Sequence, residues 1–147
     1  MTTSVESSGH DEDIVAWARA QADHIRHGRF NRLDLVHIAA EIEDVGDNQR
    51  RELAVRTAIL LKHLLAWERH PTLRNNSLDS TIRAHRQLIA RRLAKMPSLA
   101  TCFTNPDWLE DVWLDARCSA TTDGVDDFEA FPDCCPWTMA EILQDKF

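Results

Sequence analysis

The chain has 147 residues, the usual size of one domain and long enough to bury a substantial core. Hydrophobic residues make up 44% and charged residues 28%, with only four glycines and five prolines, so a long disordered chain or an all-β protein is disfavoured and helices are favoured. The formal charge of −7 and an isoelectric point near 5.4 argue against broad electrostatic capture of nucleic acid.

The sequence shows no targeting or membrane signal. No stretch approaches the roughly 18–20 apolar residues that span a bilayer, and the polar, acidic start MTTSVESSGHDED does not resemble a signal peptide. We therefore predict a disordered leader over residues 1–10 and a single helical domain over residues 11–147, located in the cytoplasm. The four cysteines contain no C-x-x-C pattern, which indicates packed or surface thiols rather than a disulfide framework or a zinc ribbon.

Apolar residues at three- and four-residue spacings predict three helices in the first half of the chain. The first begins near Ile14 and ends before Gly28, which can adopt the left-handed conformation of a helix C-cap. Asp34 can cap a second helix, for which we favour a stop at Gly46; the alternative is one longer, bent helix that continues through this glycine. The third, from about residue 47 to 68, has an apolar surface too wide for one stripe, which is typical of a central helix.

The sequence pattern of the second half of the chain predicts further helices. Asparagines and a serine at 75–77 can cap a helix that Pro97 ends, and another helical region runs from Ser98 to about Thr122 with a kink or break at Asn105-Pro106. Thr138 has the spacing of a capping box for a short last helix. The predicted fold is all-α, an up-and-down bundle of about four longer helices plus short helices.

Charge is unevenly distributed along the second half. Five cations and no acid lie between residues 83 and 95, whereas nine acids and one arginine lie between 107 and 133. This pattern indicates a basic helix that lies near an acidic one, in the same or a neighbouring subunit. A nucleic-acid face on the basic segment is the alternative, and it would show steep salt dependence.

Four segments carry a resemblance to a known family: EIEDVGDNQRREL, LLKHLLAWERHP, STIRAHRQLIARRL and FPDCCPWTMAEILQDKF. In order and spacing they resemble the bacterial family called domain of unknown function 29, from about residue 11 to 147. The resemblance implies a compact all-α bundle in a bacterial cytoplasm, and it implies no activity. The family motif carries over onto Glu41, Glu43, Asp44, Gly46, Arg51, Glu52, His63, Trp67, Arg83 and Pro136, with departures at Ala40 and Leu78.

The candidate polar residues have a structural and a functional interpretation. Glu41 lies beside the apolar stripe of its helix, so a partly buried carboxylate there must find a partner, and Arg51 or Arg83 could supply it. His63 and His85 also lie on apolar helix faces, where a hydrogen-bonded core histidine is common. If His63 and His85 meet and Glu41 joins them, the three make a metal-ligand set of the kind found inside helical bundles.

Two functions follow from these alternatives. The first is a non-enzymatic module that binds another protein or itself, for instance as a homodimer. The second is a metal-dependent, hydrolytic enzyme with a carboxylate/histidine site inside the bundle, in which arginines bind an anionic substrate. The sequence identifies no cofactor, catalytic residue or specific metal. The candidate polar constellation is Glu41, Asp44, Arg51, His63, Arg83 and His85.

Overall fold

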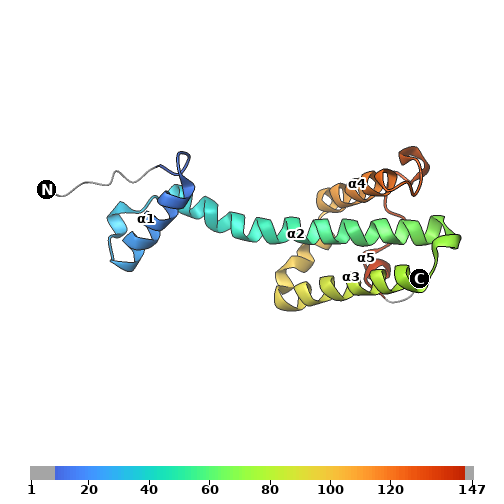
Figure 1. The fold of residues 1–147 in the computed structure, drawn as a ribbon. Helices are drawn as coiled ribbons and strands as arrows, with labels where there is room; N and C mark the ends of the chain where they lie inside the picture. Colours follow the sequence, from blue (N-terminus) through green and yellow to red (C-terminus); the bar gives the residue numbers. More distant parts are fainter. Residues whose placement is uncertain (1–8, 145–147) are drawn as a thin grey trace. The chain divides into compact units, whose positions relative to one another are not determined.

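The computed structural model describes residues 9–144, and over this range all regular secondary structure is helical, which confirms the all-α class. The α-helices are α1 (Ile14–Arg26), α2 (Leu35–Arg69), α3 (Asn76–Lys95), α4 (Pro106–Thr122) and α5 (Met139–Leu143) (Figure 1). Segments of 3₁₀ helix lie between them at Phe30–Arg32, Pro71–Leu73, Pro97–Thr104 and Phe128–Ala130. Within the described residues, no helix is long and apolar enough to cross a bilayer.

The chain divides into two compact units, Met1–Asp47 and Asn48–Phe147, and each is described by itself below. We call them the first unit and the second unit. Helix α2 contributes residues to both. Most of the predicted leader, residues 1–8, lies outside the described residues, and the single domain over residues 11–147 stays a prediction.

The predicted helix break at Gly46 is wrong. The helices expected on either side of this glycine are one helix of 35 residues. Gly46 has no positive φ, unlike Gly28 and Gly124. A glycine inside a helix costs only about 1 kcal/mol relative to alanine, and the helical bonds and packing of the rest of α2 outweigh that cost.

Side-chain caps set the other helix starts. Asp13 accepts hydrogen bonds from the amides of the first turn of α1, Asn75 does the same for α3, and Thr138 caps α5. The expected kink or break at Asn105-Pro106 is a break, because Asn105 caps α4 and Pro106 is its first residue. At the end of α1, Gly28 has φ 69°, as the sequence predicted.

The second half of α2 is the centre of the hydrophobic core of the second unit. Its leucines, among them Leu60 and Leu64, are almost fully buried. Helices α3, α4 and α5 pack around this half of α2 (Figure 1) and contribute Ile89, Val112 and Ile142. The guanidinium Nε of Arg86 in α3 donates a hydrogen bond of 2.8 Å to the carbonyl of Ile142, which fixes α5 in place.

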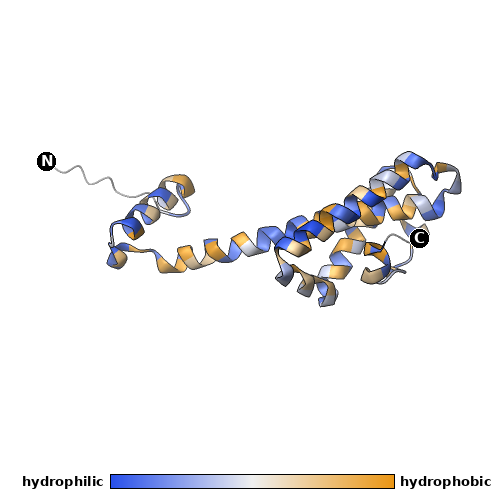
Figure 2. Cartoon of the chain, turned by 90° about the horizontal axis from the view of Figure 1, so that it is seen from below, coloured by the Kyte–Doolittle hydropathy of each residue, from blue (hydrophilic) through white to orange (hydrophobic). Residues whose placement is uncertain are grey.

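The first unit has little core of its own. Among its described residues, only Trp17 and Gln21 are buried. Eight of the twelve large hydrophobic side chains that the structure exposes belong to this unit: Ile14, Val15, Ile25, Phe30, Leu35, Val36, Ile42 and Val45. Figure 2 shows hydrophobic turns along α1 and along the start of α2.

Candidate functional site

A cluster of polar and aromatic side chains joins α1 to the start of α2 in the first unit. Asp34, the residue before α2, is at its centre. One carboxylate oxygen of Asp34 accepts hydrogen bonds from Trp17 Nε1 at 3.0 Å and from His37 Nδ1 at 2.7 Å. The Asp34 amide donates to the side-chain oxygen of Gln21 at 2.8 Å. Asp34 therefore holds the ring of His37 and both buried residues of α1.

His10 completes this cluster from the segment before α1. Its Nε2 lies 2.5 Å from a carboxylate oxygen of Glu41, and its Nδ1 lies 2.9 Å from one of Asp11. The His10 ring stacks on His37, with centroids 4.4 Å apart and an interplanar angle of 12°. It also meets the edge of Trp17 at 4.8 Å. We call His10, Asp11, Trp17, Asp34, His37 and Glu41 the His10 cluster.

Two groups of the His10 cluster have shifted pKa values. The hydrogen bond to Glu41, followed by the one to Asp11, raises the pKa of His10 above its ordinary value. The hydrogen bond from His37 is the largest cause that lowers the pKa of Asp34, and the bond from Trp17 adds to it. Both shifts favour the charged forms, so the cluster contains ionised groups near neutral pH.

His63 in α2 and His85 in α3 meet in the second unit, as the sequence required for a shared site. Their rings stack with centroids 5.4 Å apart and an interplanar angle of 21°. Burial lowers the pKa of both histidines, and Lys62 lowers that of His63 further. His85 Nδ1 is buried and has no hydrogen-bond partner among the described residues. At neutral pH the pair is therefore mainly uncharged.

The remaining candidate residues do not join this pair. Glu41 belongs to the first unit and contacts His10. The arginine partner predicted for Glu41 is wrong, because Arg51 donates to Asn48 at 2.8 Å and Arg83 pairs with Asp79 at 3.0 Å. Local partners three or four residues away in the same helix hold both guanidinium groups. Asp44 is exposed on α2.

The described ion pairs within this chain link both the basic and the acidic region to α2. Arg92 of basic helix α3 lies 3.4 Å from Glu52 in α2. Acids of the α4 region pair elsewhere, for example Asp123 with Lys62 at 3.0 Å. The central helix α2 thus supplies charged partners to both regions, because its neighbours pack on it from different sides.

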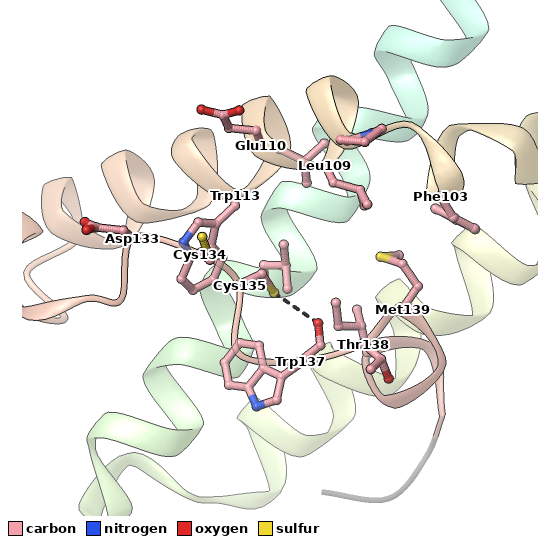
Figure 3. Close-up of a pocket in the computed structure, with 14 residues that line it drawn as sticks. Phe103, Leu109, Glu110, Trp113, Asp133, Cys134, Cys135, Trp137, Thr138 and Met139 are labelled. Atoms are coloured by element: carbon pink, nitrogen blue, oxygen red, sulfur yellow. Dashed lines mark hydrogen bonds between the residues drawn. The ribbon is translucent and has the colours of Figure 1, made fainter.

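The second unit contains an apolar pocket of about 590 Å³ (Figure 3). Trp113 and Leu109 of α4 line it together with Phe103 and Met139. Cys135 donates a hydrogen bond from Sγ to the carbonyl of Trp137, and burial raises the pKa of its thiol. The thiol is therefore protonated at neutral pH, which disfavours it as a nucleophile.

The family comparison covers both units. The family model described as Domain of unknown function DUF29 matches residues 10–147, nearly the whole chain. The chain belongs to the DUF29 family. No curated protein and no solved structure shows significant similarity to it.

The DUF29 match begins at His10, a residue that sequence reasoning assigned to the leader. Sequence reasoning also treated Asp34 only as a cap and Trp17 only as a core residue. Both have those roles, and both also belong to the His10 cluster. The one sequence signal for this cluster is a histidine beside three acids just before α1, which helical periodicity does not detect. The pocket gave no sequence signal beyond the apolar character of its lining residues.

Proposed function

We propose that this DUF29 protein is a self-associating helical module in which the first units of two copies cover each other's apolar faces. The observation that carries the proposal is the exposed stripe at the start of α2. Leu35, Ile42 and Val45 are 67%, 67% and 65% exposed. Side chains of this size are rarely left in water as a contiguous set unless they bind something.

The spacing of the stripe favours another helix as the occupant. Leu35, Ile38, Ile42 and Val45 follow one another at steps of three, four and three residues, the a/d pattern of a coiled-coil seam. A seam of this kind is self-complementary, since it meets an identical seam across a two-fold axis. A second copy of the chain therefore supplies a matching surface without any further partner.

The charges on this part of α2 support the same occupant. Glu43 and Asp44 occupy the positions after Ile42 that lie outside the seam, and both are exposed. The seam itself is free of charge, so association buries no unpaired ion.

We place this module in the bacterial cytoplasm, where thiols stay reduced, because the four cysteines are free.

The experiment is analytical ultracentrifugation of the wild type and of Ile42→Glu over a range of concentrations. We expect a concentration-dependent dimer for the wild type, and at least a tenfold weaker association for Ile42→Glu, because the variant places a charge in the seam. Val55→Glu is the matched control: Val55 is also exposed on α2, at 53%, and lies in the second unit. A monomeric wild type at every concentration, or equal association of the two variants, would contradict the proposal.

The alternative, a hydrolytic metal centre made of Glu41, His63 and His85, has weaker support. Glu41 belongs to the first unit, where it contacts His10, whereas both histidines belong to the second unit. We therefore propose no catalytic role for that set.

A further inference from the structure

The His10 cluster has the donors of a metal site. One ring nitrogen of His10, one of His37 and a carboxylate oxygen of Asp11 all lie within 4.8 Å of one another. We propose that these three residues bind one divalent transition-metal ion, with Zn²⁺ as the reference ion. The inference is independent of the self-association proposed above.

Two carboxylates orient the histidines as outer partners do in metal sites. Asp34 accepts from His37 Nδ1, which leaves Nε2 of this ring for an ion once the ring turns out of its stack on His10, because the lone pair of an imidazole nitrogen lies in the ring plane. Glu41 contacts His10 Nε2, which leaves Nδ1 on the side of Asp11. A carboxylate behind each ligating imidazole fixes its tautomer and makes its free nitrogen a better ligand.

The donor set indicates the class of ion. Two imidazole nitrogens and one carboxylate oxygen suit zinc and neighbouring first-row metals, whereas calcium and magnesium prefer oxygen ligands alone. Around zinc, ligand atoms stand about 2.0–2.2 Å from the ion. Asp11 can turn toward the histidines at little cost, because its side chain is 89% exposed. Three protein ligands leave a fourth position for water.

There are two ways to satisfy both ring nitrogens of His10. Both of its ring nitrogens face carboxylate oxygens, at 2.5 and 2.9 Å. A neutral imidazole has one N–H, so it can satisfy only one of these contacts. The other nitrogen needs an additional positive charge between it and the carboxylate. A metal ion at Nδ1 shared with Asp11 supplies that charge, as does a second proton on His10, and the experiment separates the two.

The experiment is calorimetric titration of the chelator-treated full chain with Zn²⁺. We expect one ion per chain for the wild type. Asp11→Asn and His37→Gln each remove a ligand and should weaken binding at least a hundredfold. Glu41→Gln changes only an outer partner and should weaken it about tenfold to a hundredfold. Circular dichroism of each variant, recorded without metal, checks that the helices remain.

Two controls identify the site. His27→Gln removes an exposed histidine of the first unit that lies outside the His10 cluster, beside Asp23, and should leave zinc binding unchanged. With Co²⁺ in place of Zn²⁺, the absorption spectrum should lack a thiolate charge-transfer band, because none of the four cysteines belongs to the site. A wild type that binds no Zn²⁺ would overturn the proposal. Folded Asp11→Asn and His37→Gln variants that bind Zn²⁺ like the wild type would overturn it as well.

Discussion

At the scale of single residues, the stacked pair of His63 and His85 has the clearest link between environment and protonation. Burial is the main cause that lowers both pKa values. Nearby cations add to it: Lys62 acts on both rings and Arg56 on His85, whereas Asp123 opposes the shift at His63. Each histidine thus binds a proton less readily in the folded chain than in the unfolded chain, where its pKa is near 6.5.

This difference sets the pH dependence of stability. Below pH 6.5 the two histidines bind more protons in the unfolded chain than in the folded chain. The free energy of unfolding therefore falls as the pH decreases. We expect this fall between pH 7.5 and 5.5 to be smaller in His85→Gln, which removes one titrating group and relieves repulsion on His63. Urea unfolding at several pH values measures it. An identical pH slope in wild type and variant would show that the pair does not contribute.

At the scale of elements, α2 is continuous through a glycine. Gly46 has helical backbone and nothing within 4 Å of the position that a Cβ would occupy. The left-handed Gly28 also has open space, but its φ of 69° strains any other side chain. The two glycines therefore respond in opposite ways to the same substitution.

We expect Gly46→Ala to raise the free energy of unfolding by about 1 kcal/mol, since alanine is the better helix former. Gly28→Ala should lower it by a similar amount, roughly 1 kcal/mol, because alanine disfavours positive φ. Thermal and urea unfolding of both variants at low protein concentration test this pair. A destabilised Gly46→Ala variant would indicate that another surface packs against this turn of α2 and leaves no room for the added methyl group.

At the scale of the whole molecule, burial is divided unequally between the two units. The second unit encloses a cluster of nearly solvent-free side chains around the second half of α2, whereas Trp17 and Gln21 are the buried residues described in the first. Local stability follows the number of apolar side chains removed from water. The first unit should therefore open far more readily than the second.

Native-state hydrogen exchange tests this difference. Amides near Leu60 and Leu64 should exchange only through global unfolding, and those of α1 through openings of much lower free energy. If the first unit self-associates, protection of α1 should also increase with protein concentration. Equal protection in α1 and around Leu60 in dilute, monomeric protein would contradict the unequal division of burial.

The features that the sequence predicted correctly are those that depend on local sequence pattern. The all-α class, the caps at Thr138 and Gly28 and the central, buried character of the helix around Leu60 all follow from spacing and side-chain chemistry. The continuity of α2 did not, because a penalty of about 1 kcal/mol at Gly46 leaves both outcomes close in energy. The contact between Glu41 and His10 joins residues 31 positions apart. Local sequence pattern cannot predict such a contact, because it depends on the tertiary fold.

The bond between Arg86 and the carbonyl of Ile142 has a consequence for biosynthesis. Translation delivers α2, α3 and α4 first, and their shared core includes a place that only Ile142, 1% exposed, fills. Until that residue has left the ribosome, the nascent chain lacks the buried side chain of Ile142 and the carbonyl that accepts from Arg86 Nε. The core of the second unit is therefore complete only after residue 142 has been synthesised. Before that moment, we expect chaperones that bind apolar segments to recognise the nascent chain.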